Sequence, residues 1–186
     1  SNTNLIFTTA ITRKFSAKFT NKTGITYTKM YYDMDMNLAP HQMHPMELIS
    51  QGKGNTDLIS GYTSSSIGIS EQVTLNVGVN AQVLTLNNSW TLEPRSGIKW
   101  QFSPKSSFAL AYGLHSRMEK MDVYFVKTQG TGDRSVNKDL GFTRAHHVML
   151  SYGFKISDNM NMKIEPYFQQ LYDVPVISDS SYSVLN

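Results

Sequence analysis

Hydrophobic and polar residues alternate with a period of two along most of the chain. Between residues 107 and 117, Phe108, Leu110, Tyr112 and Leu114 occupy every second position, and small residues or histidine fill the positions between them. A β-strand places successive side chains on opposite faces, so this pattern predicts a strand with one large, apolar face. A helical period is found almost nowhere, and the chain is therefore expected to be all-β.

The alternation predicts about eight long strands joined as an antiparallel meander. They cover residues 5–19, 25–38, 57–70, 73–83, 98–103, 107–117, 142–156 and 160–172. A turn is expected at 20–24, where Asn21 and Gly24 tolerate positive φ. The alternation reverses its phase near Lys29 and Met30, which predicts a β-bulge there. Many of these strands exceed the length of about 5–6 residues that is usual in globular proteins.

The connections differ in length in a regular way. Tight turns are expected near Asn21, Glu71, Pro104 and Asp158, and long loops at 39–56 and 118–141. In an antiparallel meander these turns fall at one end of the sheet and both loops at the other. Outer-membrane β-barrels have this arrangement, with short periplasmic turns and long extracellular loops. This arrangement favours a transmembrane β-barrel, and we expect residues 1–186 to form one unit.

The strands predict two faces of opposite character. One face is expected to contact lipid or a protein core; its members are Ile98, Trp100, Phe102, Phe108, Leu110, Tyr112, Leu114, Val148, Leu150, Tyr152 and Phe154. The other is expected to face the barrel lumen; its members include Lys99, Gln101, Lys163, Glu165 and Gln169. The aromatic residues fit a girdle at the membrane interfaces better than a surface for stacking sugars.

Composition narrows the classes of partner. The 186 residues carry a formal net charge of only +3, with Lys and Arg scattered singly, so no basic stripe for nucleic acid is present. The chain has no cysteine, which excludes disulfides and thiolate metal sites. No apolar run reaches the length of about 18 residues that a transmembrane helix needs, and no signal peptide is visible.

Few residues suggest chemistry. Glu93 and Glu165 each precede a proline within a strand, which indicates a pairing irregularity. Lumen-side carboxylates neutralised by Arg95, Lys99 or Lys163 are favoured over a general acid/base pair. His41 and His44 have the spacing of metal ligands, with Met43 between them, but an ordinary loop is favoured. Nucleophile elbows and phosphate loops are missing. We therefore expect no catalysis, no cofactor and no metal.

Four phrases in the C-terminal half carry a resemblance to a known family. They are LEPRSGIKW at 92–100, SFALAYGLH at 107–115, NKDLGFTRAHH at 137–147 and IEPYFQQLYDVPV at 164–176. In this order they closely resemble the barrel wall of TonB-dependent outer-membrane receptors from Bacteroidetes-type bacteria. The resemblance covers about residues 75–186, and the first 70 residues fit by strand pattern alone.

The resemblance implies a role in the active uptake of a nutrient across the outer membrane. Such receptors are barrels of about 22 strands that enclose a plug domain. The implied partners are outer-membrane lipid, the TonB energy-transducing complex through the plug region, and a surface lipoprotein lid. The implied substrate contacts are the loop residues Arg117, Glu119, Lys127 and Arg134. This chain shows no plug and only about eight strands, so we expect a fragment of the barrel.

The sequence leaves two other functions open. A soluble eight-stranded barrel or sandwich could bind a small apolar ligand, with the large-residue face pointing inward. An outer-membrane wall used for assembly or adhesion, without transport, is the third interpretation. The sequence does not identify the transported substrate.

Overall fold

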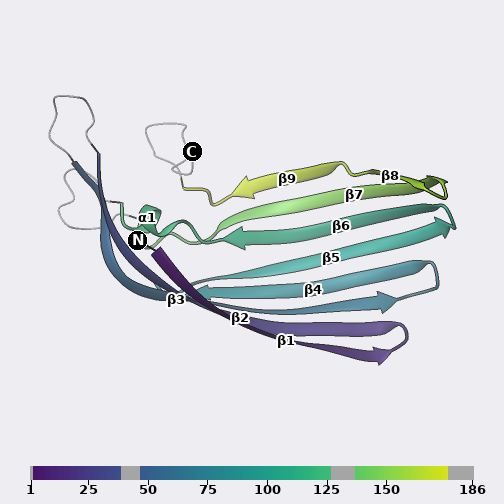
Figure 1. The fold of residues 1–186 in the computed structure, drawn as a ribbon, viewed down its shortest axis with the longest axis horizontal. Helices are drawn as coiled ribbons and strands as arrows, with labels where there is room; N and C mark the ends of the chain where they lie inside the picture. The colour runs from purple at the N-terminus through teal and green to yellow at the C-terminus, as the bar shows by residue number, and fades with distance from the viewer. Residues whose placement is uncertain (1, 39–46, 127–136, 176–186) are drawn as a thin grey trace.

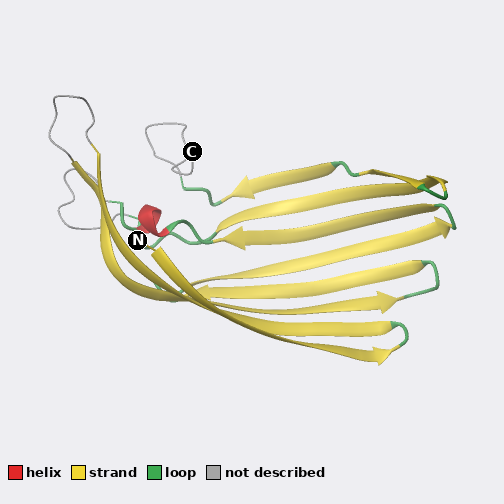
Figure 2. Cartoon of the chain, in the orientation of Figure 1, coloured by secondary structure: helices red, strands yellow, loops and turns green. Residues whose placement is uncertain are grey.

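The structure, a computed structural model, describes residues 2–38, 47–126 and 137–175, and these form a single antiparallel sheet (Figure 1). Its nine strands are β1 (Asn2–Ser16), β2 (Phe19–Leu38), β3 (Glu47–Gly68), β4 (Val73–Leu84), β5 (Ser89–Ser103), β6 (Ser106–Arg117), β7 (Thr143–Ser157), β8 (Met160–Ile164) and β9 (Tyr167–Tyr172). One short helix, α1 (Met121–Tyr124), lies between β6 and β7 (Figure 2). The all-β class and the meander are confirmed.

Strands that are consecutive in sequence are neighbours in the sheet, from β1 to β8. β8 and β9 both pair with β7, and together they correspond to the single strand predicted at 160–172. The break falls at Glu165 and Pro166, where the Leu150 N–H donates a hydrogen bond to the Pro166 carbonyl at 3.1 Å. The sheet is open and does not close into a barrel, so within the described residues β1 and the β8–β9 pair are its edges.

The sheet has its predicted tight turns at one end, but the opposite end also holds a short turn, at 85–88. The short turns at 17–18, 69–72, 104–105 and 158–159 lie together at one end, which we call the short-turn end (Figure 1). β2 ends and β3 begins at the other end of the sheet, which we call the loop end. β6 ends and β7 begins there too, and the turn at 85–88 lies with them. Asn88 in that turn has a φ of 57°, a conformation that asparagine adopts more readily than most residues.

The predicted turn at 20–24 is wrong. These residues lie within β2 and pair with both β1 and β3, and the chain reverses at 17–18 instead. Gly24 lies under the ring of its cross-strand partner Tyr62, where an added Cβ would be 2.7 Å from a ring carbon. This glycine therefore serves packing and not a turn. The predicted loop at 39–56 is also too long, because β3 begins at Glu47.

The predicted β-bulge at Lys29 and Met30 is wrong as well. Pairing of β2 with both neighbours continues in register through these residues, and the register shift lies between Met36 and Asn37. The apolar residues of β2 switch from one face to the other because the later part of β2 packs against apolar neighbours on the opposite face. Ile25 is exposed on one face, whereas Met30 is buried on the opposite face.

The main buried cluster lies on this opposite face, at the loop end. It consists of Met30, Tyr32, Leu84, Met121, Tyr124, Phe125 and Phe142, and we call it the inner cluster. The segment after β6, including α1, folds back over the sheet, and the Phe125 ring lies 4.8 Å from the Tyr32 ring. Asn87 holds the end of this segment by donating to the Leu140 carbonyl at 2.6 Å. Burial raises the pKa of Tyr124, which keeps its hydroxyl protonated.

Candidate functional site

The sheet has an apolar face and a polar face, defined by the two residue sets that the sequence predicted. Cross-strand pairing places Trp100, Phe108 and Tyr152 in one row of the apolar face. Of the eleven residues predicted for this face, Leu114 and Phe154 are partly buried and the others are exposed. Lys99, Gln101 and Lys163 line a hollow on the polar face. Whether the faces meet lipid and lumen remains a prediction.

Small residues form the floor of the main hollow on the polar face. Gly78, Gly97, Ala111 and Gly113 contribute to this hollow of about 720 Å³, which is also lined by Arg95, His115, His147, Glu165 and Tyr167. The lack of large side chains on β4, β5 and β6 leaves the space open, and charged or aromatic groups stand around it. The hollow can therefore accept a polar or mixed molecule or protein segment.

Gly78 in this floor leaves no room for a side chain. An added Cβ would lie 2.9 Å from the Thr63 carbonyl oxygen, which is backbone and cannot move alone. We expect Gly78→Ala to lower the free energy of unfolding by about 1–3 kcal/mol through this overpacking. Chemical denaturation of the refolded chain in detergent measures it. Gly61→Ala is the control, because its Cβ would meet nothing nearer than 4.0 Å; equal losses in both variants would contradict the prediction.

Two histidines that are adjacent in sequence point to opposite faces. The His147 ring lies 4.7 Å from the His115 ring on the polar face, above Gly113. The His146 ring stacks on Tyr172 at 5.0 Å, and its Nδ1 lies 2.9 Å from the Tyr112 hydroxyl. These two neighbours therefore belong to different environments and do not form a shared chelate.

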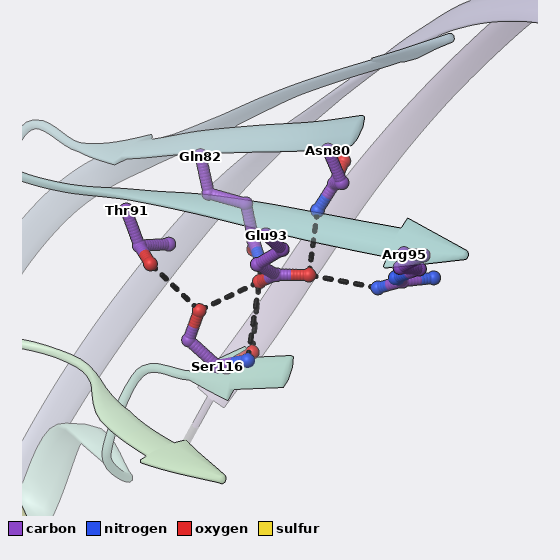
Figure 3. A network of polar contacts seen from close by, with 6 residues as sticks. All are labelled: Asn80, Gln82, Thr91, Glu93, Arg95 and Ser116. Atoms are coloured by element: carbon purple, nitrogen blue, oxygen red, sulfur yellow. Dashed lines mark hydrogen bonds and ion pairs between the residues drawn. The ribbon is translucent and has the colours of Figure 1, made fainter. Parts of the chain in front are cut away.

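Glu93 is the centre of a buried polar network beside the hollow (Figure 3). Its side chain is 1% exposed and accepts hydrogen bonds from five donors on three strands. These donors are Asn80 Nδ2 at 3.1 Å, Gln82 Nε2, Arg95 Nη2 at 2.7 Å, Ser116 N at 3.2 Å and Ser116 Oγ at 2.7 Å. The Thr91 hydroxyl extends the network to Ser116 at 2.8 Å.

The strand geometry explains why a carboxylate is needed at this position. Pro94 has no N–H, and regular pairing between β5 and β6 ends at Arg95 and Gly113. Beyond this point the Ser116 N–H donates to the Glu93 side chain in place of a β5 carbonyl. Because a buried N–H without a partner is costly, Glu93 stabilises the place where the two strands separate.

The arrangement does not favour acid/base chemistry. Glu93 already accepts five hydrogen bonds, so neither oxygen is available to take a proton from a substrate. Glu165 forms an ion pair with Lys163 at 2.7 Å. β5 and β8 are three strand spacings apart, roughly 14 Å, which is too far for the two carboxylates to act together.

Of the four residues predicted to contact substrate, the structure describes two, Arg117 and Glu119. Arg117 is exposed at the end of β6. Glu119 is 2% exposed, and one of its oxygens accepts a hydrogen bond from the Thr143 hydroxyl. Lys127 and Arg134 lie outside the described residues. Glu119 is therefore not presented at the surface of the loop, and substrate contact by the others stays a prediction.

Metal ligands do not gather in the described part of the chain, where no three His, Cys, Asp or Glu side chains come together as a site. His41, Met43 and His44 lie outside the described residues.

No helix among the described residues has the length and apolar character needed to cross a membrane.

The ion pairs of Glu93 with Arg95 and of Glu165 with Lys163 agree with the neutralisation that the sequence predicted. Sequence reasoning missed the burial of Glu93 and its hydrogen bonds from Asn80, Gln82 and Ser116, which lie on other strands. Comparison of the chain with protein-family models, curated proteins and solved structures finds no match. Its function is therefore inferred from geometry, chemistry and the sequence resemblance.

Proposed function

We propose that the chain is part of the wall of an outer-membrane β-barrel receptor that takes up a nutrient with energy supplied through TonB. The observation that carries the proposal is the contrast between the two faces of one sheet. The apolar face exposes large side chains on all of its strands, and no other layer of the described structure covers it. A wall between lipid and an aqueous lumen has this character.

Aromatic residues on the apolar face lie near both ends of the strands. Trp100 pairs with Phe108, which pairs with Tyr152, near the short-turn end. Near the loop end, Trp90 lies on the row that continues through Val83, Ile59 and Tyr27. The two tryptophans are ten positions apart, which corresponds to about 33 Å of strand. At a tilt of about 40° this spans about 25 Å, the height of the apolar band of an outer-membrane barrel.

Charged residues begin where this band would end. Lys29 and Asp57 form the next cross-strand pair on the same face, on the loop-end side of Tyr27 and Ile59. Their side chains form an ion pair at 3.2 Å. The Tyr27 hydroxyl also donates to Asp57, at 2.7 Å. An ion pair is costly within hydrocarbon but favourable at an aqueous interface. Its position therefore supports placing the loop-end boundary of the apolar band here.

In this proposal the polar face lines the lumen and the loop end lies outside the cell. The wall acts passively: it encloses a plug and presents polar groups, and the external segments help to capture substrate. The open edges at β1 and at β8–β9 require further strands, since unpaired edges are prone to association. The TonB complex and a lipoprotein lid are partners implied by the resemblance alone.

The fold argues against one of the two alternative functions and does not separate the other from transport. A soluble sandwich needs a second layer against the large-residue face, and the described residues provide none. A wall for assembly or adhesion would share the fold, and it differs only in the absence of uptake. Loss of nutrient uptake on deletion of the encoding gene would therefore support transport, and unchanged uptake would support the structural alternative.

Brominated lipids test the membrane location directly, because both tryptophans of the chain are exposed on the apolar face. In vesicles, we expect each single-tryptophan variant, Trp90→Phe or Trp100→Phe, to be quenched more by bromines at carbons 6 and 7 than at carbons 11 and 12. The physical reason is that both positions lie near an interface.

A matched variant supplies the deep reference for this experiment. Ser96 is exposed on the same face of β5, between the two tryptophans. In a Trp90→Phe/Trp100→Phe background, Ser96→Trp should show the reverse preference, with deeper bromines quenching more. Absence of quenching at all three positions in vesicle-bound protein would mean that protein covers the face, and the membrane proposal would fail.

A further inference from the structure

Two imidazole rings meet at the floor of the main hollow. His115 on β6 and His147 on β7 have ring centroids 4.7 Å apart, and both residues line the hollow. An added Cβ at Gly113 would be 2.8 Å from His115 Nε2, so this nitrogen lies directly above the glycine. Gly113 is in turn the cross-strand partner of His147. The absence of a side chain at Gly113 therefore lets the two rings approach each other from neighbouring strands.

The nitrogens of both rings are free to bind a ligand. Within the described part of the chain, none of the four nitrogens of His115 and His147 donates or accepts a hydrogen bond. Both histidines are half-buried, but all four nitrogens remain accessible to solvent. A neutral imidazole has one nitrogen with a lone pair, and this nitrogen is the commonest protein ligand of metal ions. The two rings are therefore a candidate pair of metal ligands.

The separation of the two rings fits a shared metal ion. Imidazole nitrogen binds Zn²⁺ at about 2.0–2.1 Å, which places the ring centroid about 3.2 Å from the metal. With an angle of about 90–110° at the metal, as in tetragonal and tetrahedral sites, two such rings have centroids about 4.5–5.2 Å apart. The observed separation of 4.7 Å lies within this range. The two strands therefore need not move to bring both rings to one ion.

We propose that His115 and His147 together bind one divalent ion of copper, nickel or zinc. Imidazole suits these metals, whereas Mg²⁺ and Ca²⁺ prefer oxygen ligands. The chain supplies two ligands here, fewer than the three of a typical protein site, so water or a chelating molecule fills the remaining coordination positions. The hollow, of about 720 Å³, has room for such a molecule. The inference needs the pairing of β6 with β7, and it depends on neither a membrane nor transport.

The charges around the two rings permit a cation. Arg95 lies beside Gly113, with its Cγ 3.6 Å from the position of an added Cβ. Its guanidinium forms an ion pair with Glu93 at 2.7 Å, so the two side chains together carry no net charge. Glu165 also lines the hollow, and it is paired with Lys163. The surroundings of the ion are therefore close to neutral, and its affinity comes from the imidazoles.

Copper binding to the full chain in maltoside micelles tests the proposal. The probe is Cu²⁺ as its iminodiacetate complex, which leaves neighbouring coordination positions open for protein ligands. His41→Gln/His44→Gln is the background for all measurements, because these two histidines also have the spacing of metal ligands. We expect pulsed electron paramagnetic resonance to show two imidazoles on one copper ion. One imidazole per ion, or none, would overturn the proposal.

Removal of each ring in turn measures the contribution of the pair. His115→Gln or His147→Gln should weaken copper binding at least about tenfold, because a single imidazole lacks a second ligand held beside it. His146→Gln is the matched control and should bind copper as the background does, since its ring lies on the opposite face against Tyr172. Equal affinity in all three variants would overturn the proposal. Excess Ni²⁺ should compete with the probe and excess Ca²⁺ should not; equal competition would overturn the assigned class of metal.

A glycine variant keeps both ligands and changes only their approach. Gly113→Ala would place a methyl group 2.8 Å from His115 Nε2, so the ring has to move away. All other contacts of this methyl group are 3.4 Å or longer, so the fold should tolerate it. We expect copper binding to weaken at least about tenfold, because a ligand pair needs accurate placement. Gly97→Ala on the same floor, with no contact nearer than 3.4 Å, is the control and should bind copper as the background does. Unchanged binding in Gly113→Ala would overturn the proposal, even if a histidine variant fails to fold.

Discussion

Replacing Glu93 by alanine is expected to lower the free energy of unfolding by about 3–5 kcal/mol, a large effect for a single polar side chain. The substitution removes the acceptor of five hydrogen bonds and leaves a partly desolvated Arg95 without its partner. It also leaves the Ser116 N–H without an acceptor at the point where β5 and β6 separate. Denaturant titration of the chain in detergent micelles or vesicles, followed by circular dichroism, measures the loss.

Glu165→Ala is the matched control, because Glu165 also precedes a proline within the sheet. Its ion pair with Lys163 is solvent-accessible, with the Glu165 and Lys163 side chains 36% and 61% exposed. Exposed ion pairs contribute about 0–1 kcal/mol, so this variant should unfold almost as the parent chain does. Losses of similar size in both variants would contradict the role assigned to the Glu93 network and would point to the Glu-Pro backbone instead.

Replacing Tyr124 by alanine is the second change with a large expected effect, also about 3–5 kcal/mol. Tyr124 is completely buried and belongs to the inner cluster. Its ring helps to hold the segment after β6 against the polar face of the sheet. Truncation should therefore release this segment, and hydrogen exchange of its amides should become faster before that of β4, β5 and β6.

Tyr167→Ala controls for the loss of an aromatic ring as such. Tyr167 is 75% exposed at the start of β9, so little burial is lost with it. Its variant should change the free energy of unfolding by less than about 1 kcal/mol. If Tyr124→Ala lowers stability while exchange after β6 stays unchanged, the inner cluster does not anchor this segment.

The Glu93 and Tyr124 variants probe different parts of the proposed lumen. The Glu93 network supports the floor of the main hollow, whereas the inner cluster fixes the segment that carries Met118, Glu119 and Met121. A wall that offers binding groups to a lumen needs both to be rigid, because a polar group positions a ligand only when its own partners hold it. These variants therefore test the scaffold separately from any ligand.

The all-β class, the meander, the end of the sheet at which most tight turns lie and the two faces all follow from the amino-acid sequence alone. Each rests on local information: the period of two defines the faces, and connection lengths define the ends of the sheet. The registers of β4 to β7 bring Trp100, Phe108 and Tyr152 into one row, as the alternation of each strand separately indicated.

Which part of each face is covered depends on the tertiary structure. Considered locally, the phase reversal near Met30 indicates a β-bulge. Its cause is that a segment some ninety residues later in the chain packs on β2. The same is true of Gly24, which looks like a turn residue until Tyr62 is placed over it. Glu93 and Glu119 look like ordinary polar residues in the sequence, and both are buried. Burial depends on contacts between residues that are distant in the chain. The alternation of apolar and polar residues along one strand carries no information about those contacts.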